Sequence, residues 1–338
     1  MPGTCYYHSP MSFIAIIAAL LLEQARPVGR TNAVQAVLRS WVGWCGRTFD
    51  AGKAHHAWLA WSAAVLLPAA LVLAVYWLLV AFVGWPMAVV WNIAILYHCL
   101  GFRQFSHHFT DIRDALEAND EALARRRLAH WQQVDVNGLP RSEIVRHVVE
   151  HSVIAAHRHV FGALAWFSLL AVLGLGPVGA VIYRLAEFVP RYWAREKSTR
   201  VRPVSESAQD VASHMWYLFD WLPARITAVG FAVTGSFEDA IDSWRNYERR
   251  ADVSNDGVIL ASTSGAINLR LSAVMDAAGA RAPEQGAATA GAWASGSTDP
   301  SGQVPEAGHL RVVVGLVWRT VVMWLVLLAL LSLARLLG

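Results

Sequence analysis

An aspartate and an arginine stand within an otherwise apolar stretch of the chain. Asp220 and Arg225 belong to the string Asp-Trp-Leu-Pro-Ala-Arg, inside the segment 215–237. A carboxylate and a guanidinium are costly in such surroundings unless they pair or face water. On a helix interrupted by Pro223 they could form an ion pair with each other. Alternatively they belong to a ligand site, and the spacing leaves both interpretations open.

A second string, at 147–151, has the spacing of a zinc site. His147 and His151 are four residues apart and would share one face of a helix, with Glu150 between them, as in the H-x-x-E-H pattern of inverted zinc peptidases. A third ligand would have to come from Glu187, Glu196 or Glu206, none of which lies in a ligand motif. We favour neutral interfacial histidines, with His157 and His159 extending the same stripe, and expect no metal site.

Composition places these residues in a membrane protein. Of 338 residues, 55% are hydrophobic and 16 are tryptophan, and the mean hydropathy is +0.37. Residues 54–102 contain no Asp, Glu, Lys or Arg. Gly84, Trp85 and Pro86 divide this tract into expected spans at 58–83 and 86–102. A shorter apolar stretch covers 11–22. We find neither a phosphate-binding P-loop nor a dinucleotide fingerprint, and nothing that indicates nucleic-acid binding.

Charge placement predicts the orientation. The loop 23–53 and the region after Arg103 are both rich in arginine, and a hairpin between them returns the chain to one side. Positive loops stay in the cytoplasm. We therefore predict a multi-pass membrane protein with its N-terminus outside and its basic loops cytoplasmic.

The expected fold is an all-α, polytopic membrane helical bundle with short or re-entrant helices and cytoplasmic helical segments. Asn119 or Asp120 could cap one helix of the cytoplasmic region, and another begins near Ser142. Gly174 to Pro177 interrupts 159–189, which indicates a re-entrant hairpin. Cys5, Cys45 and Cys99 are interpreted as free thiols. The predicted divisions are a disordered tail 1–10, membrane helices with a basic loop 11–102, a cytoplasmic helical region 103–158, a re-entrant core 159–275, a flexible linker 276–310 and a final transmembrane helix 311–338.

From about Met11 to Leu271 the order of segments resembles the CobD/CbiB superfamily. The resembling stretches are 143–150, 176–184, the string at 220–225, and Ser254-Asn255-Asp256-Gly257 with the small residues that follow. The resemblance implies two branches. One joins an aminopropanol phosphate to a corrinoid carboxylate with ATP and Mg²⁺. The other, AmpE-like branch contains proposed inner-membrane signalling modulators linked to β-lactamase induction. The resemblance thus implies a protein of the bacterial inner membrane.

The sequence departs from the acidic motifs of the synthase branch. No acid occurs in 152–162, Ala186 to Pro190 replaces an Asn-Thr-Leu-Asp string, and Trp216 and Tyr217 stand where two aspartates are expected. Because Mg²⁺ needs hard oxygen ligands, the leading hypothesis is an AmpE-like, non-catalytic accessory protein without a cofactor. The resembling segment Arg191 to Arg195 also favours that branch.

Each hypothesis has its own residues and partners. The accessory protein would bind a corrinoid, a cell-wall fragment or a membrane protein partner, in contact with membrane lipid. Its expected ligand-binding residues are Glu150, His157, Asp220, Arg225 and Asn255. The alternative is a diverged cobalamin enzyme that uses ATP and Mg²⁺ with Glu150, Asp220 and Arg225 as catalytic residues. A zinc peptidase with His147 and His151 is the third possibility.

Overall fold

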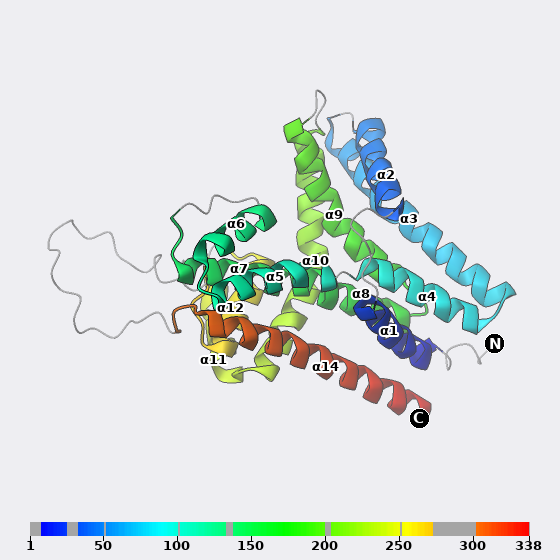
Figure 1. Ribbon diagram of the computed structural model, residues 1–338. Coiled ribbons are helices and arrows are strands. Elements are labelled where there is room, and N and C mark those ends of the chain that lie inside the picture. The colour runs from blue at the N-terminus through cyan, green and yellow to red at the C-terminus, as the bar shows by residue number, and fades with distance from the viewer. Residues whose placement is uncertain are drawn as a thin grey trace, which may run out of the picture. The chain divides into compact units, whose positions relative to one another are not determined.

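The computed structural model describes residues 8–25, 33–50, 52–100, 102–132, 138–199, 204–250, 252–272 and 302–337. In chain order (Figure 1), the helices are α1 (His8–Ala25), α2 (Ala33–Phe49), α3 (Ala54–Phe82), α4 (Trp85–Cys99), α5 (Phe102–Glu117), α6 (Glu121–Gln132), α7 (Arg141–Ala156), the π-helical turn η1 (His157–Phe161), α8 (Gly162–Val172), α9 (Val178–Thr199), α10 (Glu206–Thr234), α11 (Phe237–Glu248), α12 (Asn255–Ile267) and α14 (Ala307–Leu337). Over these ranges there is no strand, only an isolated bridge between Leu269 and Gln303. The predicted all-α class is confirmed.

Within the described residues, three helical stretches have the length and composition to cross a membrane. They are Ala54–Phe82, Arg141–Val172 and Ala307–Ala334, and a shorter apolar helix covers Phe13–Ala25. The second of them runs without interruption through α7, η1 and α8, so no helix end falls at the expected division between 158 and 159. These stretches support a membrane protein. The re-entrant hairpin, the orientation in the membrane and the packing of the helices as a bundle remain predictions.

Two expected helix breaks are present. α3 ends at Phe82, and α4 begins after Gly84, whose φ of 103° excludes most side chains. The second break separates α8 from α9 around Gly174 and Gly176. Gly176 also has a positive φ, and a Cβ there would lie 2.8 Å from the ring of Tyr76. A glycine is therefore required at that position by both conformation and space.

Two expectations were wrong in detail. The basic segment 23–53 is not a simple loop, because α2 occupies Ala33–Phe49. Pro223 does not interrupt its helix either, because α10 continues from Glu206 to Thr234. Proline has no N–H to offer the carbonyl of Phe219, four residues earlier. That carbonyl instead accepts a hydrogen bond from Nε1 of Trp166 at 2.8 Å, which compensates for the missing helical bond.

Some predictions fall partly outside the described residues. Residues 1–7 of the expected tail and 276–301 of the expected linker lie outside them. The rest of the tail includes the first residues of α1, and the rest of the linker includes the first residues of α14. Cys5 is also outside, while Cys45 and Cys99 are buried free thiols. The predicted cap of the helix after residue 120 is confirmed, because Asp120 accepts a hydrogen bond from the Leu123 amide. The domain divisions themselves stay a prediction.

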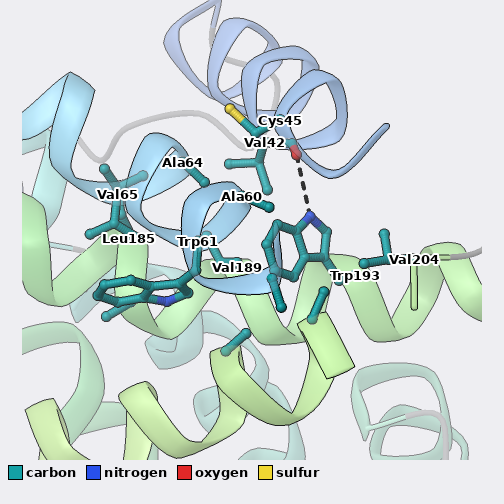
Figure 2. Packing of buried hydrophobic residues seen from close by; sticks show 14 residues of the cluster. Val42, Cys45, Ala60, Trp61, Ala64, Val65, Leu185, Val189, Trp193 and Val204 are labelled. Atoms are coloured by element: carbon teal, nitrogen blue, oxygen red, sulfur yellow. Dashed lines mark hydrogen bonds between the residues drawn. The ribbon is translucent and has the colours of Figure 1, made fainter. Parts of the chain in front are cut away.

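The helices form two compact units, which we describe separately. Unit 1 contains residues 1–106, 155–223 and 324–338, and unit 2 contains 107–154 and 224–323. In unit 1, α2, α3, α9 and the first part of α10 enclose an apolar core around Trp61 and Trp193 (Figure 2). The Trp193 indole donates a hydrogen bond to the carbonyl of Val42 at 3.2 Å. This bond fastens α9 to α2, and so fixes the helix that carries Arg184, Glu187 and Arg191, three of the charged residues described below.

In unit 2, α11 and α12 pack closely against each other. Their contact depends on small residues, since a Cβ on Gly265 would lie 2.2 Å from the backbone oxygen of Asp239. The hydroxyl of Ser262 donates to the carbonyl of Ala228, which ties α12 to the last part of α10. These helices position Arg225 and Asn255.

Candidate functional site

A buried trio of polar side chains joins three helices of unit 1. His157 comes from η1, Tyr183 from α9 and Asp220 from α10, and all three are at most 1% exposed. One oxygen of Asp220 lies 2.8 Å from Nε2 of His157 and accepts the hydroxyl proton of Tyr183 at 2.9 Å. The Tyr183 hydroxyl is 3.4 Å from the same His157 nitrogen. Such a closed set satisfies a buried carboxylate, which would otherwise be very unfavourable.

The trio needs a glycine beside it. A Cβ on Gly162 would lie 2.1 Å from the Tyr183 ring, so only glycine lets the ring approach η1. Asp220 and His157 were both expected to bind ligand, but the structure places them in the protein interior. With no exposed surface, they can orient the surrounding helices without touching a substrate.

The turn that carries His157 is π-helical over His157–Phe161. Single π turns within α-helices cost backbone energy and are frequent at functional sites. Here the turn presents three consecutive polar residues, His157, Arg158 and His159. Arg158 lies over the indole of Trp216 at 5.9 Å from the ring centroid, a cation–π contact.

A second charged group in unit 1 centres on Glu187 of α9. Its carboxylate is 3% exposed and is bound by Arg184 on one oxygen and by Arg191 on the other. Burial alone raises the pKa of Glu187, but Arg184, Arg191, His159 and Arg158 together lower it to about 2. We call Arg184, Glu187 and Arg191 the arginine cluster.

Unit 2 holds the other pair of expected ligand residues. Arg225 donates a hydrogen bond to Oδ1 of Asn255 at 2.9 Å and lies 3.6 Å from a carboxylate oxygen of Glu248. Ser254 caps α12 by accepting the amide of Gly257 at 3.0 Å, and its hydroxyl lies 3.2 Å from that of Tyr247. The structure therefore brings Arg225 and Asn255 together. Asp220 instead binds His157 and Tyr183 within unit 1. The ion pair between Asp220 and Arg225, one of the two interpretations of the sequence, is not formed.

Glu150 connects α7 to the chain at Ser272 within unit 2. Its carboxylate accepts the backbone amide of Ser272 at 2.6 Å and lies 3.4 Å from Arg146, which also binds Glu143. The nearby His151 packs edge-on against Trp131 with 4.4 Å between ring centroids. In the described part of the chain, no three His, Cys, Asp or Glu side chains converge as metal ligands would.

The arginine cluster was missed as a unit by the sequence reasoning. Glu187 was considered only as a third zinc ligand, and Arg184 only as part of a family stretch. The signal was nonetheless present, because Arg184, Glu187 and Arg191 are spaced three and four residues apart and so share one helix face.

Comparison with known proteins decides the family. The sequence profile described as "CobD/Cbib protein" matches residues 14–290. The chain belongs to the CobD/CbiB family. Its predicted membership is thereby confirmed, although the match does not single out an AmpE-like branch and does not show that the acidic motifs are degenerate.

Curated relatives of this CobD/CbiB chain are cobalamin biosynthesis proteins. The cobalamin biosynthesis protein CobD of Stutzerimonas stutzeri (strain A1501) is 28% identical over 94% of this chain and 96% of its own length. A protein of the same name from Chromobacterium violaceum is 30% identical over 53% of this chain and 54% of its own length. A third, from Leptospira interrogans, is 24% identical over 56% and 59%. No solved structure matches the chain. These relatives favour the cobalamin alternative over the AmpE-like hypothesis.

Proposed function

We propose that this CobD/CbiB protein is a membrane enzyme of cobalamin biosynthesis. Its reaction joins the amine of an aminopropanol phosphate to a corrinoid carboxylate as an amide, at the expense of ATP. The observation that carries the proposal is the similarity to the Stutzerimonas stutzeri protein, which extends over 94% of this chain and 96% of that one. An AmpE-like signalling role has no comparable support.

The expected site residues differ in whether their side chains are exposed enough to contact a substrate. Arg225 and Asn255 are the best candidates for substrate contact, because Arg225 carries a positive charge on a side chain that is 16% exposed. Asp220 and His157 are buried and act as positioning residues through Tyr183. Glu150 holds the chain near Ser272.

When bound, Mg²⁺ would neutralise the phosphates of ATP, whose cleavage would drive amide formation and carry away the displaced carboxylate oxygen as phosphate. Mg²⁺ usually keeps several waters and binds through substrate phosphates and one or two protein carboxylates. A dedicated set of three acids is therefore unnecessary. Glu248, 42% exposed and beside Arg225, would hold the ion. The acids absent from 152–162 consequently do not exclude the enzyme.

The test is amide formation by the purified protein in lipid nanodiscs. The reaction would contain the corrinoid acid, aminopropanol phosphate and Mg²⁺–ATP, and mass spectrometry would detect the amide. The Stutzerimonas stutzeri protein serves as a parallel sample. We expect amide from both proteins, and a large loss of rate when Arg225 is replaced by Gln. Amide from the relative alone would overturn the proposal and return the AmpE-like hypothesis to first place.

A further inference from the structure

We propose that one face of α14 binds the phosphate of an anionic membrane phospholipid through the guanidinium group of Arg319. α14 (Ala307–Leu337) is one of the helices with the length and composition to cross a membrane (Figure 1). Arg319 lies within the apolar part of this helix, where a charge without an anionic partner is unfavourable. The lipid site is independent of the proposed reaction, because none of its residues belongs to the candidate substrate site.

Within the part of the chain that the structure describes, Arg319 has no carboxylate partner. Its side chain is exposed, and its Nε donates a hydrogen bond to the backbone carbonyl of Gly315 at 3.2 Å. That carbonyl carries no net charge, and the bond uses one of the five N–H donors of a guanidinium. The positive charge of Arg319 is therefore available to a further anion.

Three residues spaced four apart form a polar face on the first half of α14. Arg311, Gly315 and Arg319 lie at positions i, i+4 and i+8, so they share one side of the helix. Nothing lies within 4 Å of a Cβ built on Gly315, which leaves open space at the position between the two arginines. A phosphate group can approach Arg319 there without displacing another side chain.

The side chain of Arg319 points toward the N-terminal end of α14. The Gly315 carbonyl that it contacts lies one turn earlier, the direction in which helical Cα–Cβ bonds tilt. At that end, Arg311 is 72% exposed and pairs with Glu117 at 2.8 Å, as expected of residues in water or among lipid headgroups. Arginines inside a membrane span extend in this way to the interface, where anionic headgroups attract them.

The second half of α14 offers the apolar surface that an acyl chain needs. From Thr320 to Leu333 the helix contains no Asp, Glu, Lys, Arg or His. Val322, seven residues and about two turns after Gly315 on the same face, is 54% exposed. A phospholipid has its parts in the same order, with a charged phosphate at the interface and hydrocarbon beyond it. This face therefore matches a lipid better than a soluble anion.

The experiment uses full-length protein in phosphatidylcholine nanodiscs that contain a low fraction of phosphatidylglycerol with a photoreactive acyl chain. After illumination, mass spectrometry compares cross-linked lipid on α14 with that on α3, an apolar helix without Asp, Glu, Lys or Arg. Arg319→Gln should lower the ratio of α14 to α3 cross-linking roughly 10-fold, the size of a lost charge-assisted hydrogen bond. Arg319→Lys, which keeps the charge, should retain most of the cross-linking.

The matched control is Arg245→Gln, which removes the same charge from an exposed position on α11 and should leave the ratio unchanged. Circular dichroism verifies that each variant is folded. In the native protein, unlabelled phosphatidylglycerol should compete with the probe on α14 and not on α3, which tests the site without any substitution.

Two results would overturn the lipid site. One is the same cross-linking ratio in the native protein and in folded Arg319→Gln, or competition that is equal on α14 and α3. The other is a dimer of the native protein that Arg319→Gln dissociates while lipid cross-linking stays unchanged. That outcome would assign the charge of Arg319 to a carboxylate of a second copy of the chain.

Discussion

Single residues of unit 1 are constrained by close contacts more than by their own chemistry. Gly162 and Asp220 illustrate this, since one leaves room for the Tyr183 ring and the other satisfies its hydroxyl. Neither constraint is visible in a pattern of residue types, because Tyr183 lies 37 residues before Asp220 in the sequence. The string at 220–225 could be recognised from the sequence, but the true partners of its charged residues could not.

Replacing Gly162 by Ala should lower the stability of the protein. The added Cβ would lie 2.1 Å from the Tyr183 ring. Such overpacking lowers the free energy of unfolding by about 1–3 kcal/mol. The measurement is the apparent melting temperature in detergent, and Gly315→Ala is the matched control, because nothing lies within 4 Å of a Cβ there. Equal melting temperatures for the two variants would contradict the contact.

Glu187 should make stability depend on pH in the acid range. Its pKa in the folded protein is about 2, against an ordinary value of 4.5. The unfolded chain therefore takes up the proton first as the pH falls, so the contribution is complete above about pH 4.5 and is lost progressively toward about pH 2.

The corresponding measurement compares melting temperatures of the native protein and Glu187→Gln between about pH 3 and pH 7. The advantage of the native protein should be constant above about pH 5 and should shrink below it. Glu238→Gln, at an exposed site on α11, provides the control. A difference that did not change with pH would show that Glu187 titrates normally.

The boundaries of the helices can be predicted from the local sequence more directly than the side-chain contacts can. Both ends of α3 and α4 and the first residues of α6 and α7 lie close to the expected positions, because glycine, proline and capping residues act within a few residues. Pro223 is the exception. Its helix continues because a tryptophan from α8 satisfies the released carbonyl, and local sequence does not reveal a partner 53 residues away.

The cap of α12 gives a prediction at this scale. Ser254→Ala removes the acceptor of the Gly257 amide and should destabilise the first turn of α12 by about 0.5–2 kcal/mol. Hydrogen exchange at Gly257 and Val258 should become faster. Ser236→Ala is the matched control, since Ser236 precedes α11 without accepting a side-chain cap bond. The same acceleration at α11 after that control substitution would argue against a specific cap.

At the scale of the whole molecule, hydropathy identified the long apolar helices, but orientation rests on charge placement alone. The prediction is that Arg47 and Arg126 face the cytoplasm and Trp85 the opposite side. Cysteines placed singly at these exposed positions, with the native cysteines replaced by Ala, should react with an impermeant maleimide accordingly. Labelling of residues 47 and 126 from opposite sides of the bilayer would contradict the topology.

The π turn has a consequence for biogenesis. His157 belongs to an apolar stretch that the ribosome completes before Tyr183 and Asp220 have been made, and Asp220 follows it by 63 residues. Until residue 220 has been made, the imidazole lacks the carboxylate that it meets in the folded protein. In a nascent chain halted before residue 220, we therefore expect this stretch to remain next to the insertion machinery. It would enter the lipid only after the later helices have been made.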